Sequence, residues 1–182
     1  MIVAITGGIG SGKSVVSQVL RLLGYPVYDC DANAKRLMNE SVALRESLVK
    51  RFGTDLYRQG AFNAQYLSSI VFADQSALAD LNAIVHPAVK ADIQAWWREK
   101  GGLVFVETAI PYSSGVNQIV DKIWKVTAPT EVRVERVMAR NGMTRVQVEQ
   151  RIASQASEEV QSDKDVVIIN DGTTAVIPQI VE

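Results

Sequence analysis

The residues with the clearest chemical potential form a glycine-rich segment near the start of the chain. Residues 7–14 read GGIGSGKS and match the pattern G-x-x-x-x-G-K-[ST] at every fixed position. Glycines let backbone N–H groups converge on phosphate oxygens, and a helix that begins there directs further N–H groups at the same anion. A glycine-rich turn that only reverses the chain has no need of Gly-Lys-Ser before a helix. The segment therefore predicts a nucleoside triphosphate site.

The phosphate loop also assigns individual roles. We expect Lys13 to bring a positive charge to the β- and γ-phosphates of ATP and Ser14 Oγ to ligate Mg²⁺. The remaining expected ATP contacts are made by the loop and the residue after it, at Gly8, Gly10, Ser11, Gly12 and Val15.

Acidic residues follow two of the apolar runs. Asp29 and Asp31 come directly after the apolar run at residues 25–28, where a carboxylate could orient an attacking hydroxyl and accept its proton. The alternative is that Asp31 caps a helix that begins near Ala32, with Asp29 solvated. Glu107 ends the apolar run at residues 103–106. It could hold the water shell of Mg²⁺ or a substrate hydroxyl, or could be a structural carboxylate.

Arginines are concentrated in the last third of the chain. Arg133, Arg136 and Arg140 are spaced by three and four residues on one predicted helix, and Arg145 and Arg151 follow. Guanidinium groups stabilise the charge of a transferring phosphoryl group when a lid closes over it. The alternative for each is a solvated helix face with surface ion pairs. We assign the functional role first to Arg140, beside Asn141-Gly142.

The elements that must position these residues alternate along the chain. Short apolar runs predict buried parallel strands at residues 2–5, 25–28, 103–106, 123–126 and 166–169. Helical patterns occupy residues 13–23, 42–52, 77–99 and 130–140. Pro87 predicts a break or kink in the third, and Thr144 with Gln147 predicts a capping box for a further helix. The alternation predicts an α/β domain with a five-stranded parallel sheet.

The composition excludes several classes of protein. The chain has 182 residues, 47% of them hydrophobic, and a formal net charge of -1. This balance gives no general reason to bind nucleic acid or an anionic membrane. One cysteine, Cys30, allows neither an internal disulfide nor a thiolate metal cage. No apolar run is long enough to span a bilayer, and the N-terminus lacks the features of a signal peptide. We expect a soluble, cytoplasmic protein.

Four segments in order resemble the dephospho-CoA kinase family: TGGIGSGKS at residues 6–14, DCD at 29–31, LNAIVHP at 81–87 and IINDG at 168–172. The resemblance implies Mg²⁺-dependent transfer of the ATP γ-phosphoryl group to the 3′-hydroxyl of dephospho-CoA, the last step of coenzyme A biosynthesis. It also implies one P-loop kinase domain over residues 1–182, a three-layer α/β sandwich of the nucleoside-monophosphate-kinase type. A helical CoA-side insertion would lie at about 32–100 and a lid at about 140–156. ATP and dephospho-CoA would be the partners of a monomer or weak homo-oligomer, with no nucleic acid and no membrane.

The resemblance carries over to single residues. It makes Asp31 the base toward the 3′-hydroxyl and places His86 on the acceptor side, together with Glu107. It puts Arg140 in the lid or at its hinge and Asn170 near the adenine of ATP. Arg151 and Gln155 match an R-x-x-x-Q pattern that follows the lid. For His86, a satisfied histidine at a helix end is the alternative.

The chain also departs from the family pattern. Where a D-x-P-L-L-F-E-like stretch is usual, residues 107–113 read ETAIPYS, so the proline is displaced and Ser113 replaces the later acid. The acceptor contacts of that stretch do not carry over directly. The chain also stops shortly into an expected last helix, as a truncated chain would.

Two other functions fit a phosphate loop. One is a different small-metabolite kinase of the same fold, which substrate profiling would distinguish. The other is a nucleotide-dependent switch or binding module. The sequence holds no Asn-Lys-x-Asp guanine signature, and acids with arginines around the loop suit transfer better than switching.

Overall fold

The computed structural model of the chain describes residues 1–158, 160 and 162–181. The chain divides into two compact units, one formed by Met1–Asp29 with Trp97–Glu182 and the other by Cys30–Trp96. The second unit is therefore inserted into the first between residues 29 and 97. The first unit holds the phosphate loop.

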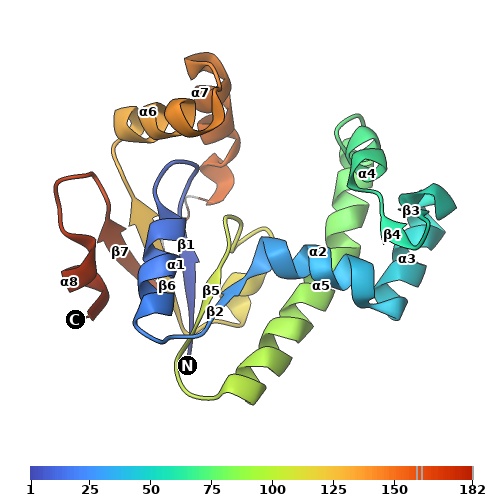
Figure 1. Cartoon of the computed structure of the whole chain (residues 1–182), viewed down its shortest axis with the longest axis horizontal. Helices are drawn as coiled ribbons and strands as arrows, with labels where there is room; N and C mark the ends of the chain where they lie inside the picture. Colours follow the sequence, from blue (N-terminus) through green and yellow to red (C-terminus); the bar gives the residue numbers. More distant parts are fainter. Residues whose placement is uncertain (159, 161, 182) are drawn as a thin grey trace. The chain divides into compact units, whose positions relative to one another are not determined.

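A parallel sheet forms the centre of the first unit (Figure 1). Within the described residues its five strands are β2 (Val27–Asp29), β5 (Val104–Glu107), β1 (Ile2–Thr6), β6 (Lys122–Thr127) and β7 (Asp165–Ile169), in that order across the sheet. All neighbouring pairs run parallel. Every residue of β1 is buried, as the apolar run at the N-terminus predicts for a central strand. The α/β class and the five-stranded parallel sheet are confirmed.

Two helices cover one face of this sheet. These are α1 (Lys13–Leu22) and the short α8 (Val176–Val181). Val16 and Leu20 of α1 and Ile180 of α8 pack in one buried cluster with Ile5 and Phe105 of the sheet. This packing fixes α1 against the strands, and α1 carries the end of the phosphate loop.

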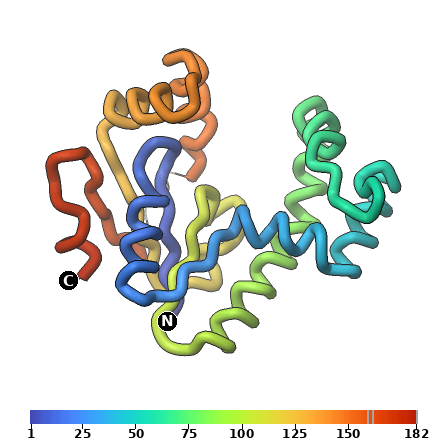
Figure 2. The backbone as a smooth tube through the Cα atoms, in the orientation of Figure 1, coloured from blue at the N-terminus to red at the C-terminus, as the bar shows by residue number. Residues whose placement is uncertain are grey.

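A helical pair connects β6 to the segment before β7. The helices are α6 (Thr130–Asn141) and α7 (Arg145–Ser154), drawn in orange in Figure 2. Gly142 ends α6 in the left-handed conformation, and Thr144 with Gln147 forms the predicted capping box at the start of α7. Val134 and Val137 of α6 pack on Val148 of α7. A 3₁₀ turn, η3 (Ala156–Glu158), follows α7, and another, η2 (Val116–Gln118), precedes β6.

The second unit is largely helical. It contains α2 (Cys30–Glu40), α3 (Val42–Phe52), η1 (Thr54–Leu56), a hairpin of β3 (Tyr57–Arg58) and β4 (Ala61–Phe62), α4 (Ala64–Val71) and most of α5 (Gln75–Lys100). Of the break or kink expected at Pro87, the break is wrong, because α5 continues through this residue, and the kink stays a prediction. A proline removes a single bond of the helical ladder. The buried residues Val85, Val89 and Ile93 continue at helical spacing on both sides of it.

None of the helices in the described part of the chain is long and apolar enough to cross a membrane.

Candidate nucleotide site at the phosphate loop

The phosphate loop connects β1 to α1 at the carboxyl edge of the sheet. Gly12 is the N-cap of α1 and has a φ of 95°, and Gly10 has a φ of 79°. Both values lie in the left-handed region that favours glycine. The backbone N–H of Ser11 donates to Gly8 O at 3.1 Å, which closes the turn. Lys13 begins the helix, so its side chain and the first N–H groups of α1 belong to the same end of the loop.

Helix α6 packs against the loop and holds its backbone. Arg133 is buried, and its Nε donates to Ile9 O at 3.0 Å. A Cβ on Gly10 would lie 2.5 Å from Arg133 O, and one on Gly8 would overlap the Arg133 guanidinium. The approach of the α6 backbone therefore requires glycine at position 10, and at position 8 a larger residue would displace the buried Arg133 side chain.

Asn170 holds the other side of the loop. It follows β7, and its Nδ2 donates to Ser11 O at 3.0 Å, with the amide packed onto Gly12. Arg136 of α6 donates from Nη1 to Asn170 O at 2.9 Å and to Gly10 O at 3.4 Å. The expected ATP-site residues of the loop and Asn170 thus lie together, and Arg136 connects them.

The start of α1 faces an acid on a neighbouring strand. Ser14 Oγ donates to Glu107 Oε1 at 3.4 Å. Glu107 ends β5, in register with Ile5 of β1 on one side and Asp29 of β2 on the other. A serine hydroxyl with carboxylates is the oxygen donor set that Mg²⁺ prefers in kinases, where phosphates of the nucleotide supply further ligands. The described residues contain no cluster of three or more His, Cys, Asp or Glu that could hold a metal by itself.

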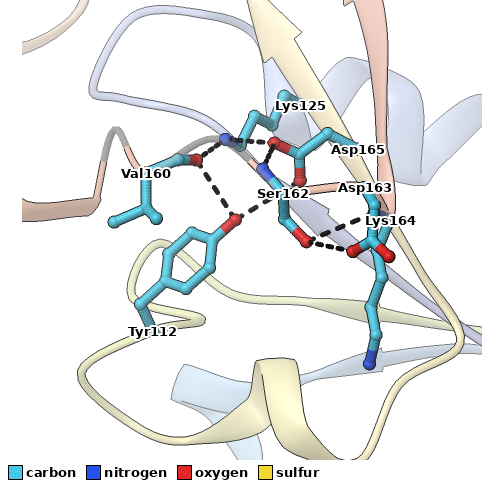
Figure 3. A network of polar contacts seen from close by, with 7 residues as sticks. All are labelled: Tyr112, Lys125, Val160, Ser162, Asp163, Lys164 and Asp165. Atoms are coloured by element: carbon cyan, nitrogen blue, oxygen red, sulfur yellow. Dashed lines mark hydrogen bonds and ion pairs between the residues drawn. The ribbon is translucent and has the colours of Figure 1, made fainter.

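A polar network that the sequence analysis missed lies on β6 and β7 (Figure 3). Lys125 pairs with Asp165 at 2.6 Å and also donates to Val160 O. Tyr112 OH donates to Val160 O at 3.2 Å and lies 3.3 Å from Asp165 Oδ1. Burial raises the pKa of Tyr112, opposed by the charge of Lys125 and supported by that of Asp165. One feature of the sequence indicates this network, because the charged Lys125 lies within the apolar run Ile123-Trp124-Lys125-Val126.

A cavity of about 510 Å³ opens beside the phosphate loop. Its lining includes Gly8, Ser11, Lys125, Arg133, Gln155 and Glu158, from the loop, β6, α6 and the turn after α7. The phosphate loop and the turn that follows α7 therefore line the same cavity.

Comparison with known proteins identifies the family. A family model described as dephospho-CoA kinase matches residues 1–175. A protein of that name from Porphyromonas gingivalis is 40% identical, over 98% of this chain and 90% of the relative. The chain belongs to the dephospho-CoA kinase family. A crystal structure of a Thermus thermophilus protein matches with a TM-score of 0.79 at 33% identity, over 99% of this chain and 92% of the other.

The fold of the dephospho-CoA kinase family extends to more distant kinases. A shikimate kinase structure from Bacteroides thetaiotaomicron matches with a TM-score of 0.58 at 12% identity, over 99% of this chain and 94% of the other. That likeness concerns the fold alone. It agrees with the P-loop kinase architecture that the phosphate loop and the parallel sheet indicate.

Some residues that the dephospho-CoA kinase resemblance selects are not among the loop contacts described above. Arg140 is exposed in the last turn of α6, where its Nε donates to Asn141 Oδ1 at 2.7 Å. Asp31 and His86 belong to the second unit, Asp31 exposed in the first turn of α2 and His86 half-buried within α5. The alternative in which Asp31 caps a helix near Ala32 is wrong, because α2 begins at Cys30. Their roles in this kinase family member stay predictions.

The stretch that departs from the dephospho-CoA kinase pattern is held by a distant acid. Ser113, which stands where the pattern has an acid, donates through Oγ and N–H to Glu158.

Arg145, one of the candidate arginines, instead pairs with Glu131 at 2.9 Å on the surface, which raises the pKa of Arg145 and lowers that of Glu131.

Proposed function

We propose that this chain transfers the γ-phosphoryl group of Mg·ATP to the 3′-hydroxyl of dephospho-CoA, giving coenzyme A and ADP. The observation that supports the proposal best is the phosphate loop fixed by Arg133, Arg136 and Asn170, in a member of the dephospho-CoA kinase family.

In the proposed reaction the 3′-oxygen attacks the γ-phosphorus in line, and the bond between that phosphorus and the β–γ bridging oxygen breaks. ADP leaves with the electrons of that bond, and Asp31 accepts the hydroxyl proton. Lys13 places its charge on the β- and γ-phosphates, and Arg140 adds a guanidinium from the end of α6. The phosphate loop orients the nucleotide through its backbone N–H groups, Asn170 lies on the adenine side, and His86 contacts the acceptor.

Ser14 and Glu107 are the proposed partners of Mg²⁺, because their oxygens already face each other at 3.4 Å. When bound, the metal neutralises charge on the β- and γ-phosphates. We assign Ser14 as a direct ligand. Glu107 accepts from the water shell of the metal or from the acceptor.

The same proposal divides the chain by task. The helical residues of about 32–100 form the acceptor-side insertion, and residues of about 140–156, which include α7, form the lid. We place the enzyme in the cytoplasm, because its one cysteine suits a reducing compartment. Its net charge of -1 gives no reason to expect a polyanionic partner. We propose a monomer or weak homo-oligomer.

An acceptor panel tests this function. Purified protein with ATP and Mg²⁺ is assayed for ADP release alone and with dephospho-CoA, AMP, adenosine or shikimate. We expect release that depends on dephospho-CoA and exceeds that with the other acceptors. Turnover with one of the others in its place would keep the kinase fold and overturn the substrate, and ATP binding without any turnover would support a binding module.

A further inference from the structure

A short turn after α7 contacts two loops of the first unit at once. It runs from Gln155 to Glu158, and Glu158 N donates to Gln155 O at 3.0 Å. We propose that Glu158, together with Gln155, is a positioning residue of the phosphoryl-transfer site: the turn holds the phosphate loop and the loop after β5 at a fixed separation. This inference rests on the proposed function, and it gives both residues a role toward the loops of the protein rather than toward the reacting groups.

Gln155 fixes the crest of the phosphate loop. Its Oε1 accepts from the backbone N–H of Ile9 at 2.7 Å, while Arg133 Nε donates to Ile9 O at 3.0 Å. The Ile9 peptide group is thus bonded on both sides by protein side chains. The N–H of Ile9 is committed to Gln155, so this peptide acts as a support for the loop rather than as a phosphate donor.

Glu158 fixes the loop after β5. Its Oε2 accepts from Tyr112 N–H at 2.9 Å, and its Oε1 accepts from Ser113 N–H at 3.1 Å and from Ser113 Oγ. Hydrogen bonds to a carboxylate are about twice as strong as those between neutral groups. Since this loop begins directly after Glu107, its position determines where the end of β5 points.

The turn is itself held in place, so it can couple the two loops. Gln155 N donates to Ile152 O at 3.1 Å at the end of α7. On the other side, Tyr112 OH bonds to Val160 O, and Lys125 pairs with Asp165 at 2.6 Å (Figure 3). The loops that the turn joins carry the phosphate cradle on one side and Glu107 with its Ser14 contact on the other.

In-line transfer requires both loops to be placed to a fraction of an ångström. The turn adds no group to the reaction, but it sets the geometry in which Lys13, Ser14 and Glu107 act. We therefore expect that loss of the contact with the loop after β5 and loss of the contact with the phosphate loop affect different kinetic constants.

Two variants and one control separate these effects. Glu158→Gln replaces one carboxylate oxygen by an N–H₂ donor, so one of the two backbone N–H groups loses its acceptor. Gln155→Leu leaves Ile9 N–H without its acceptor. Glu135→Gln is the control, because Glu135 is exposed on α6 and lies outside the residues assigned to the lid.

Amide hydrogen exchange in the substrate-free protein is the first readout, and it does not depend on activity. We expect faster exchange at one of the two amides of Tyr112 and Ser113 in Glu158→Gln and at Ile9 in Gln155→Leu, by about tenfold for each lost bond to the side chain. Glu135→Gln should leave all three amides unchanged. Unchanged exchange at Tyr112 and Ser113 in Glu158→Gln would overturn the anchoring.

Steady-state kinetics with dephospho-CoA is the second readout. We expect Glu158→Gln to lower kcat by about tenfold with KM for ATP nearly unchanged, and Gln155→Leu to raise KM for ATP by a similar factor. Faster exchange with kinetics equal to those of Glu135→Gln would reduce the turn to a structural role and overturn the proposal. If the unmodified chain fails to phosphorylate dephospho-CoA, the proposed function is what fails. The kinetic comparison then uses the acceptor that the panel identifies, and no turnover with any acceptor would overturn the positioning role as well.

Discussion

Replacing Gly12 by alanine tests how tightly the phosphate loop is built. Gly12 has a φ of 95°, and a Cβ there would overlap Nδ2 of Asn170. Gly24 is a matched control, because its φ is 88° and nothing lies within 4 Å of a Cβ built on it. Both substitutions force alanine into the left-handed region, but Gly12→Ala alone also meets a buried side chain.

The structure sets the size of the difference. Left-handed backbone costs alanine about 1–2 kcal/mol, and this cost is common to both variants. At Gly12 the Asn170 amide must move, which breaks its 3.0 Å bond to Ser11 O and adds about 1–2 kcal/mol. The Asn170 backbone is fixed by its N–H, which donates to Thr127 O at 2.8 Å, so the amide moves by rotation of the side chain. We expect Gly12→Ala to lower the free energy of unfolding by about 2–4 kcal/mol and Gly24→Ala by about 1–2 kcal/mol.

Urea unfolding of each variant, followed by circular dichroism, measures these differences. A double-mutant cycle with Asn170→Ala isolates the contact, because in that background the Cβ at position 12 has no amide to displace. Gly12→Ala should then cost no more than Gly24→Ala does in the unmodified chain. Equal losses for the two glycines, or a loss at Gly12 that Asn170→Ala does not reduce, would refute the reasoning.

The other predictions concern three acids. Asp31→Asn should lower turnover by ~10²–10⁴ with ATP affinity retained, whereas the exposed control Asp55→Asn should not; near-normal turnover would exclude Asp31 as the base. Glu107→Gln should raise the Mg²⁺ concentration for half-maximal activity about tenfold, and an unchanged titration would remove Glu107 from the metal site. The backbone N–H of Thr174 chiefly lowers the pKa of Asp171 in the folded state. Asp171 therefore stabilises the fold above its unfolded pKa of about 3.9, and that stabilisation is lost as the pH falls. In thermal unfolding at several pH values, acid should lower the melting temperature of Asp171→Asn less than that of the unmodified chain. Equal decreases in the two proteins would contradict this.

The apolar strands were predictable because parallel strands buried on both faces leave continuous runs in the sequence. The run at 103–106 became β5 (Val104–Glu107), and the second expected strand is shifted to β2 (Val27–Asp29). Helix α2 entered the sequence analysis only as an alternative, a helix that begins near Ala32, because its residues, CDANAKRLMNE, show little apolar periodicity. The hairpin of β3 and β4 was missed because each strand has only two residues.

The site was predictable as far as its residues are close in sequence. The phosphate loop is one continuous segment, so its type and place could be read directly. The contacts that hold it join residues far apart, such as Gln155 with Ile9, and spacing in the sequence carries no sign of them. Arg133 illustrates the limit: its place on a helix with other arginines suggested contact with a phosphoryl group, and the structure turns its Nε onto the backbone of Ile9.

The most direct test of the central claim is to locate the new phosphate in the product. The chain is incubated with ATP, Mg²⁺ and dephospho-CoA, and the product is fragmented by mass spectrometry beside authentic coenzyme A. We expect one added phosphate on the 3′-oxygen of the ribose, with one ADP formed for each coenzyme A. A phosphate at another position, or ADP formed without a phosphorylated acceptor, would contradict the account.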